Sequence, residues 1–540
     1  MNIQNAGKFI HLVILTSLIG YFLSCSENKQ ERIISTGLIG TWYGESDFTN
    51  IKEPELLTGL EWRWDEESGH GKNWAARWQG MIIGPVTGEV TFRLWSLKYA
   101  ELQIAAHKIS VSAPQGEASM TVLMEKGDAL PIEVAYAHAD GGEGSLLVEW
   151  QWRDQPLHGI PVDALYFTEK QALAWNYVPE PDPATVDTTK FLRVPSEHVI
   201  VYFEPGRFGG WPANNGIWKW ENDEILVGFT QGYYKASEWH HSIDESKPSF
   251  SVLGRTLDGG YTWVLEDPEN FVGDGAPEKV LHDPIDYSHA GFILRNSGKN
   301  FYFSCNRGKT WRGPFQYPDF GREDLTSRTD YIIDGPADCM IFMSAEEDSV
   351  EARMQDRAFC VRTMNGGLTF DFLSWIGDPI TVRSVMPSSA RLSENHLITA
   401  LRRRHDEKFP DKPKLQRNWI DIYESLDNGK SWQFLSKVAD TDMHKRNGNP
   451  PSLVRLSDGR ICVTYGYRAV PYGIRARISN DNGMTWSEEI HLRDDGRTWD
   501  IGYTRSVQRS DGKIVTIYYY TTKSHIEQHI AATIWDARGI

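Results

Sequence analysis

Ser479-Asn480-Asp481-Asn482-Gly483-Met484-Thr485-Trp486 has the composition of a tight turn between two strands. The carboxylate of Asp481 can accept hydrogen bonds from backbone N–H groups of its own turn. Gly483 suits a backbone with positive φ, which residues with a side chain resist. Thr485 leads back into a strand, and Trp486 offers a large apolar ring to bury against a neighbouring element.

This turn pattern occurs five times in the chain, with Asn in place of Asp in two copies. The other copies are Thr256-Leu257-Asp258-Gly259-Gly260-Tyr261-Thr262-Trp263, Ser304-Cys305-Asn306-Arg307-Gly308-Lys309-Thr310-Trp311, Thr363-Met364-Asn365-Gly366-Gly367-Leu368-Thr369-Phe370 and Ser425-Leu426-Asp427-Asn428-Gly429-Lys430-Ser431-Trp432. Successive copies lie about 50–60 residues apart, a period in the range of four-stranded propeller blades.

The repeated pattern resembles the Asp-box of the sialidase superfamily. The resemblance implies an all-β fold whose larger part is a six-bladed β-propeller, and it implies a structural role for each box, so no box residue is assigned to the active site. A count of seven blades is the alternative and needs a blade within the long loops.

Length and composition limit the classes of protein that need to be considered. A chain of 540 residues exceeds one ordinary core, so two or more domains are expected. Aromatic residues make up 12% of the chain and glycine is abundant at 47 residues, which suits many short strands joined by tight turns. The net charge of −17 argues against nucleic acid or an anionic membrane surface as a partner.

The N-terminus has the features of a targeting segment. Lys8 supplies a positive charge, and residues 9–23 are largely apolar but too short for an ordinary membrane span. Phe22-Leu23-Ser24-Cys25 resembles the end of a bacterial lipoprotein signal, which implies a signal peptide over residues 1–25 and lipidation of Cys25. The protein is then expected in the bacterial cell envelope, held to a membrane only by its lipid. A plain secretory signal is the alternative.

The remaining cysteines give no metal-binding pattern. Cys305, Cys339, Cys360 and Cys462 lack CxxC spacing and a histidine cluster, so neither a metal nor another cofactor is expected. Cys339 and Cys360 can pair in an oxidising compartment, although buried free thiols are the simpler expectation.

Residues 37–168 form a first module. Alternating apolar and polar residues with Gly and Pro between them predict an antiparallel β-sandwich. The order of its motifs resembles the protective-antigen-type module, some members of which bind sugar through calcium held by paired aspartates. The matching position reads Ser96-Leu97-Lys98-Tyr99-Ala100, without those aspartates. A carbohydrate-binding role and a spacer role both remain open, and a stiff, Pro-rich linker is expected over residues 169–196.

Residues 197–540 are expected to form the propeller. The apolar run Val199-Ile200-Val201-Tyr202-Phe203 can pair with the last blade and close the ring. Blade one is expected to contain residues 217–229, and the starts of the later blades are expected near Tyr287, Thr329, Arg383, Asn449 and Asp500.

Polar residues at the same position of successive blades converge on the propeller axis. This position gives a set of candidate substrate-binding residues: Asn214, Asn215, Arg328, Asp330, Arg383, Asn449, Arg468, Asp500 and Arg505. The loop after Arg383 also offers Arg402, Arg403 and Arg404, to which no role is assigned. Arginine grips a planar carboxylate with two parallel hydrogen bonds, so an acidic sugar is the natural ligand.

The resemblance to sialidases implies roles for individual residues. In that family three Arg hold the sugar carboxylate, a Tyr paired with a Glu attacks the anomeric carbon, and an Asp serves as acid/base. Tyr503 matches the nucleophile, because Gly502-Tyr503-Thr504-Arg505-Ser506 starts the last blade in a similar context. A tyrosine nucleophile also avoids repulsion from the substrate carboxylate.

The sequence departs from the family in three places. Trp211 stands where the first blade of sialidases has Arg, and a similar motif around Arg193 precedes the ring-closing strand. The Glu partner of the Tyr has no match. The loop His240-His241-Ser242-Ile243-Asp244 stands at the acid/base position, so Asp244 is expected to be the acid. Alternatively, His240 or His241 transfers the proton.

Three functions follow from these residues. The first is a metal-independent glycosidase of the sialidase type that releases a terminal acidic sugar from a glycan. The second is a propeller lyase or unusual glycosidase that acts on uronic-acid-containing glycans. The third is a glycan-binding lipoprotein without activity, for which Trp211, Trp218 and Trp239 would form an aromatic platform.

Overall fold

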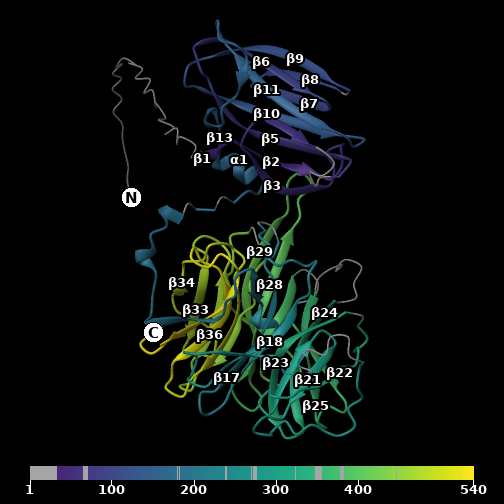
Figure 1. Ribbon diagram of the computed structural model, residues 1–540, viewed down its shortest axis with the longest axis vertical. Coiled ribbons are helices and arrows are strands. Elements are labelled where there is room, and N and C mark those ends of the chain that lie inside the picture. Colours follow the sequence, from purple (N-terminus) through teal and green to yellow (C-terminus); the bar gives the residue numbers. More distant parts are fainter. Residues whose placement is uncertain are drawn as a thin grey trace, which may run out of the picture.

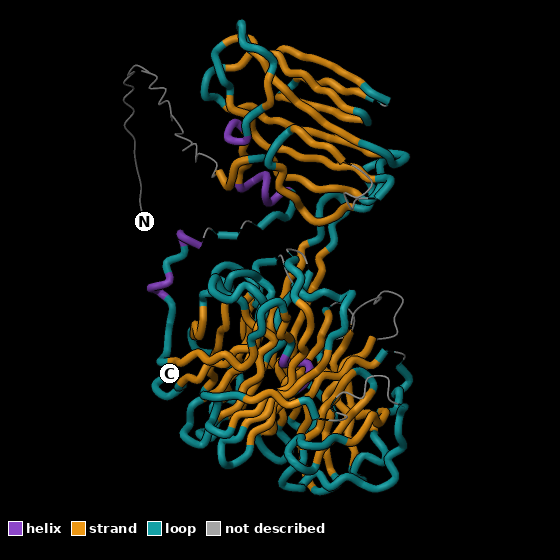
Figure 2. The backbone as a smooth tube through the Cα atoms, in the orientation of Figure 1, coloured by secondary structure: helices purple, strands orange, loops and turns teal. Residues whose placement is uncertain are grey.

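The computed structural model shows an all-β protein with two modules, a β-sandwich and a six-bladed β-propeller (Figures 1 and 2). The predicted lipidation site Cys25 lies outside the described residues. The structure describes residues 33–64, 71–112, 114–178, 180–181, 183–237, 240–268, 271, 277–322, 324–346, 356–377, 382–444 and 447–540.

Two antiparallel sheets form the sandwich. The larger sheet has the order β1-β13-β5-β10-β7-β8 with β2 and β3 at its side, and the smaller has β12-β11-β6-β9 with β4 beside β11. The strands are β1 (Ile33–Thr36), β2 (Leu38–Tyr43), β3 (Ile51–Leu57), β4 (Glu61–Trp64), β5 (Trp74–Ile83), β6 (Gly88–Ser96), β7 (Tyr99–Ile104), β8 (His107–Val111), β9 (Gly116–Met124), β10 (Ala129–His138), β11 (Gly144–Gln151), β12 (His158–Gly159) and β13 (Leu165–Thr168).

Alternation along these strands places one face of each sheet in a shared core. In β6 the residues Val90, Phe92 and Leu94 are fully buried, whereas the residues between them are partly exposed. Between β6 and β7, Lys98 donates from Nζ to the carbonyl oxygens of Ala139 at 2.9 Å and Gly141 at 2.8 Å. These bonds join this turn to the segment after β10.

A short helix and an extended segment lead from the sandwich to the propeller. Helix α1 (Glu169–Ala174) begins at Thr168, which forms a reciprocal capping box with Gln171. Three 3-10 turns accompany it, η1 (Val162–Ala164) before the helix and η2 (Pro183–Thr185) and η3 (Thr188–Lys190) after it. Within the described residues, no helix is long and apolar enough to cross a membrane.

Six sheets form the blades of the propeller. Blade one has β15 (Arg207–Gly210), β16 (Ile217–Lys219), β17 (Ile225–Tyr233), β18 (Phe250–Thr256) and β19 (Val264–Glu266). Blade two has β20 (Ile293–Ser297), β21 (Asn300–Ser304) and β22 (Arg312–Gln316). Blade three has β23 (Leu325–Gly335), β24 (Asp338–Glu346), β25 (Asp356–Thr363) and β26 (Asp371–Ile376). Blade four has β27 (Arg383–Arg391), β28 (Leu397–Glu407), β29 (Leu415–Ser425) and β30 (Gln433–Asp440). Blade five has β31 (Ser452–Arg455), β32 (Ile461–Tyr467), β33 (Gly473–Ser479) and β34 (Ile490–Arg493). Blade six has β35 (Gly502–Gln508), β36 (Ile514–Tyr520), β37 (His529–Trp535) and β14 (Ser196–Tyr202).

Blade six is completed by the strand that precedes blade one. Strand β14 pairs with β37 in antiparallel register, from Ser196 opposite Trp535 to Tyr202 opposite Ile530. The expected ring-closing role of residues 199–203 is confirmed by this pairing. Buried apolar residues of blades one and six then form one cluster, which includes Val227 and Val515.

The five repeated turns, which we call the repeat turns, each join the last two strands of blades one to five. In the turn from Ser479 to Trp486, the Ser479 hydroxyl accepts the Gly483 N–H at 2.8 Å, and Gly483 has φ 93°. The Asp481 carboxylate accepts the Thr485 N–H at 2.9 Å and the Thr485 hydroxyl at 2.6 Å. These bonds close the turn and direct Trp486 towards Ser436, to which its Nε1 donates at 2.9 Å.

One expectation differs from the structure in detail. Blade two begins at Ile293 rather than near Tyr287, because residues 285–292 form turns, including the bond from the Phe292 N–H to the His289 carbonyl at 2.8 Å. The expectation that Cys339 and Cys360 are buried free thiols is confirmed. Cys462 is also a buried free thiol, and Cys305 is an exposed one.

The repeat turns give a stability prediction. We expect Asp481→Ala to lower the thermal unfolding midpoint, because the Thr485 N–H and two hydroxyl groups lose their acceptor, a loss of about 1–2 kcal/mol. Asp481→Asn is the matched control and should cost much less, since Asn365 makes the equivalent bonds to Thr369 in its own turn. Differential scanning calorimetry of both variants tests this, and equal midpoint losses would contradict it.

Candidate functional site

A four-residue helix lies at the centre of the propeller. Helix α2 (Pro212–Asn215) contacts β17, β23 and β35, which belong to blades one, three and six, and Figure 2 shows it as a purple segment among the propeller strands. Its Ala213 packs with Val385 and Met386 of blade four and with Tyr503 of blade six. Residues far apart in the sequence therefore meet around this helix.

Tyr503 lies in this central region at the start of β35. Its backbone has φ 51°, a left-handed conformation that is uncommon for a residue with a large side chain. The buried Asn449 side chain holds this backbone, because its Oδ1 accepts the Tyr503 N–H at 2.8 Å while its Nδ2 donates to the Ile501 carbonyl at 3.3 Å. Strain of this kind persists where the surroundings impose it, and it is common at functional sites.

Three arginines from three different blades surround the Tyr503 phenol, and we call them the arginine cluster. They are Arg328 of blade three, Arg402 of blade four and Arg468 of blade five. Arg402 is 6% exposed and donates from Nη1 to the Tyr503 hydroxyl at 3.3 Å. The guanidinium group of Arg468 lies 5.5 Å from the centre of the Tyr503 ring.

The arginine cluster has no carboxylate partner among the described residues. Arg328 donates instead to the Asn214 amide oxygen at 2.9 Å, and Arg468 donates to the carbonyl oxygens of Asn447 and Ile501. Burial lowers the pKa of Arg328 and Arg402 from its ordinary value, which reflects the cost of holding these cations away from water. The cluster is thus a concentration of positive charge that an anionic ligand can neutralise.

The positive charge also acts on Tyr503. Burial by itself raises the pKa of the phenol, but the three guanidinium groups outweigh this effect and hold that pKa below its ordinary value. Arg402 makes the largest contribution among the three. A phenol with a lowered pKa is a better nucleophile or general base near neutral pH, because more of it is ionised.

A histidine–aspartate pair adjoins the cluster. His241 Nδ1 lies 2.5 Å from Asp500 Oδ1, and the second carboxylate oxygen accepts the Ser242 N–H at 2.9 Å. The Tyr519 hydroxyl donates to Asp500 at 2.6 Å, and Arg468 donates to that hydroxyl at 2.6 Å. One continuous hydrogen-bond network therefore joins the histidine to the arginine cluster.

The pair has the electrostatics of a proton-transfer group. Burial alone raises the pKa of Asp500, but the hydrogen bond with His241 and the charges of His241 and Arg468 outweigh it and hold that pKa below its ordinary value. The ionised Asp500 accepts the Nδ1–H of His241, which leaves Nε2 to exchange a proton with a ligand. The His241 side chain is 30% exposed, between the rings of Trp211 and Trp499.

Of the residues that the sequence proposed, six belong to this network or support it, as described above: Tyr503, Arg328, Arg468, Asn214, Asn449 and Asp500. Arg383 lies at its edge, where its guanidinium group is paired with Asp356 at 2.6 Å. The charge of Arg383 still contributes to the lowered pKa of Arg402.

Three proposed substrate-binding residues make internal contacts instead. Arg505 is buried and donates to the carbonyl oxygens of Ala213 and Thr329, so it ties blade six to α2 and blade three. Asp330 accepts the Ser389 hydroxyl at 2.7 Å, and burial raises its pKa to about 6. Asn215 is 2% exposed and accepts from Arg295 Nε at 3.1 Å. These contacts stabilise the fold around the site.

The residues proposed for proton transfer differ in their contacts, although His240, His241 and Asp244 line one small cavity. Asp244 accepts the N–H and hydroxyl of Ser246 and pairs with Lys247 at 3.5 Å, so its carboxylate is bound within its own turn. His240 is exposed and lines a cavity beside the sandwich, as described below. No described contact links either residue to Tyr503, and the geometry favours His241 over both.

Sequence reasoning left Arg402 without a role and did not single out His241. The sequence feature that could have indicated Arg402 is the run of three arginines in β28. The other two form ion pairs, Arg403 with Asp421 and Arg404 with Asp406. Arg193, considered as a replacement for the missing first-blade arginine, pairs with Asp494 at 2.5 Å and lies away from the cluster. No group of three metal-ligating side chains occurs among the described residues.

Comparison with known proteins gives a family for the sandwich. Residues 36–164 match the PA14 domain. No curated protein matches the chain.

Several solved structures resemble the chain over its larger part. A Dyadobacter fermentans protein of unknown function is 21% identical with a TM-score of 0.47, over 63% of this chain and 98% of that one. An α-L-arabinanase from Penicillium chrysogenum is 14% identical with a TM-score of 0.41, over 64% of this chain and 98% of the arabinanase chain. A mutant Trypanosoma rangeli sialidase is 12% identical with a TM-score of 0.40, over 64% of this chain and 59% of the sialidase chain. Because these identities are low, the chemistry of the site has to be inferred from the contacts among its own residues.

The charges around Tyr503 predict a measurable titration. The ultraviolet difference between the protein and Tyr503→Phe isolates one phenol, which we expect to ionise below the ordinary tyrosine pKa of about 10. Arg402→Met should raise that pKa, because the nearest cation is removed. Arg538→Met, which removes an exposed arginine, should leave it unchanged. A Tyr503 pKa at or above 10 would contradict the electrostatic interpretation.

Proposed function

We propose that this protein is a glycosidase that releases a terminal acidic sugar, of the sialic acid type, from a glycan. The observation that carries the proposal is the arginine cluster around Tyr503, which has no carboxylate partner among the described residues. Arginine is the side chain best suited to bind a planar carboxylate. The resemblance of the repeat turns to Asp-boxes supports a sialidase-like propeller as the framework of this site.

The proposed reaction uses Tyr503 and His241 in turn. The phenolate oxygen of Tyr503 attacks the anomeric carbon while protonated His241 gives its proton to the departing glycosidic oxygen, and a glycosyl-tyrosine intermediate forms. Water then attacks the anomeric carbon, His241 takes the proton of that water, and the phenolate leaves. Asp500 stabilises the charged imidazole, and the arginine cluster holds the carboxylate of the sugar.

A second candidate is a lyase for uronic-acid-containing glycans. It is favoured by the environment of the Tyr503 hydroxyl, whose one hydrogen-bonding side chain in the described structure is Arg402, so no Glu completes the sialidase pair. The phenolate would take the C5 proton, the arginine cluster would neutralise the uronate carboxylate, and His241 would protonate the departing oxygen. The product would carry a C4–C5 double bond.

The products of two substrates separate these functions. We expect incubation with a sialylated oligosaccharide to release free sialic acid, measured by chromatography, because the cluster fits the carboxylate of a terminal sugar. A rise in ultraviolet absorbance with a uronic-acid oligosaccharide would instead establish the lyase. Binding of either oligosaccharide without any product would show a glycan-binding protein and overturn the proposal of an enzyme.

Two neighbouring histidines provide a matched pair of variants. We expect His241→Ala to lower kcat by about 10²-fold or more on a small acidic aryl glycoside, because general acid catalysis is lost. His240→Ala should keep that activity, since His240 has no described contact with the network. Steady-state kinetics measure both. Similar losses in the two variants, or full activity in His241→Ala, would remove the histidine–aspartate pair from the mechanism.

A further inference from the structure

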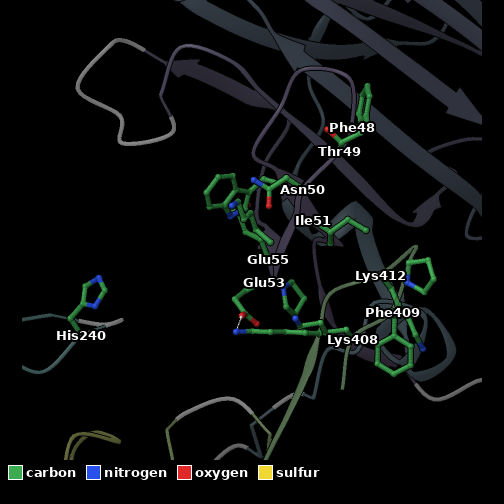
Figure 3. Close-up of a pocket in the computed structure, with 15 residues that line it drawn as sticks. Phe48, Thr49, Asn50, Ile51, Glu53, Glu55, His240, Lys408, Phe409 and Lys412 are labelled. Carbon is green, nitrogen blue, oxygen red and sulfur yellow. Dashed lines mark ion pairs between the residues drawn. The ribbon is translucent and has the colours of Figure 1, made fainter. Parts of the chain in front are cut away.

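A second cavity lies between the two modules, outside the network around Tyr503. Its volume is about 1050 Å³, and its walls come from β2, β3 and the loop between them on one side and from the tip of the β28–β29 hairpin on the other (Figure 3). Figure 1 shows that this hairpin extends out of the propeller to reach β3. A cavity of this size matches sites that hold ligands of several rings.

The walls of the cavity are tied together by polar contacts. Asn176 donates from Nδ2 to the Pro413 carbonyl at 2.5 Å, which joins the segment after α1 to the hairpin tip. Lys414 of the tip lies 3.6 Å from the Glu53 carboxylate of β3. These two contacts join the hairpin tip to β3 and to the segment after α1.

Aromatic rings line both walls. Trp42 and Phe48 belong to the sandwich, and Phe409 belongs to the hairpin tip. Residues of the sandwich itself hold Phe48 in place. The Arg77 guanidinium group lies 5.1 Å from its ring centre, and Tyr43 meets it edge-on. Fixed aromatic faces beside polar groups are typical of sites that bind sugar rings, whose C–H faces are apolar and whose rims carry hydroxyl groups.

The charge of the lining favours an anion. Four lysines and two glutamates line the cavity. Glu53 is paired with Lys414, and burial raises the pKa of Glu55. Lys408 is exposed and has no ion-pair partner among the described residues. Positive charge therefore remains available in the cavity of a protein whose net charge is −17.

The large cavity shares one lining residue with a smaller cavity beside the histidine–aspartate pair. His240 lines both the large cavity and a smaller one of about 350 Å³. His241, the next residue, lines the smaller cavity and makes the 2.5 Å contact with Asp500. An extended ligand bound beside His241 would therefore pass His240, the residue that the two cavities share.

We propose that the cavity between the modules binds the remaining sugar units of an acidic oligosaccharide whose terminal unit occupies the arginine cluster. This inference rests on the proposed function and specifies its substrate as an oligosaccharide with more than one acidic unit. Lys408 and Lys412 hold the acidic groups of the internal sugars, and Trp42, Phe48 and Phe409 contact their rings. The sandwich is then a part of the substrate-binding site.

Direct binding tests the inference without requiring turnover. The probes are a uronic-acid hexasaccharide and a multiply sialylated oligosaccharide, each compared with its monosaccharide by isothermal titration calorimetry on the full chain. We expect one acidic oligosaccharide to bind at least about tenfold more tightly than its monosaccharide, and Lys408→Ala/Lys412→Ala to remove about that factor. Monosaccharide binding should not change in this variant.

Matched variants decide the outcome. Lys309→Ala/Lys430→Ala removes two exposed lysines of the repeat turns and should leave all affinities unchanged. Phe409→Ala should weaken binding of the oligosaccharide and leave binding of the monosaccharide unchanged. Equal affinity for monosaccharide and oligosaccharide, or unchanged oligosaccharide binding in the Lys408/Lys412 variant, would overturn the inference even if a terminal sugar is released. If the oligosaccharide binds in a way that depends on these lysines but no product forms, the cavity is an oligosaccharide-binding site and the proposed glycosidase activity is wrong.

Discussion

The pairing of β14 with β37 is the constraint on which the propeller depends. It joins residues 196–202 to residues 530–535 and sets blade six beside blade one. The contact of His241 with Asp500 crosses this same junction, since one residue follows a strand of blade one and the other precedes a strand of blade six. Ring closure therefore creates the histidine–aspartate pair as well as the fold.

The centre of the ring concentrates positive charge in three guanidinium groups that form no ion pair with a carboxylate of the described residues, and this opposes folding. Burying a guanidinium group without a counter-ion costs free energy, and here Arg328, Arg402 and Arg468 share one phenol. Buried Arg255, by contrast, is paired with Glu224 at 2.5 Å. This concentration of guanidinium groups around one phenol is the feature on which the proposed function rests.

The sequence predicted the repeat turns, the ring-closing strand and the position of Tyr503 near the propeller axis, because each depends on local composition or on position within a regular blade. It did not separate His241 from His240, since the two are adjacent in a loop without the periodicity of a strand. It also assigned Arg505 to the substrate, whereas the residue braces α2. Burial and hydrogen-bond partners decide such roles, and a spacing pattern contains neither.

The junction between the first and last blades also bears on how the chain matures. Strand β14 leaves the ribosome more than three hundred residues before β37, as their positions 196–202 and 529–535 imply. Until then β14 is an unpaired edge, which invites aggregation. Contacts so distant in sequence also slow folding. A nascent chain of this architecture therefore gains from a holding chaperone, and truncation at its C-terminus leaves the circle open.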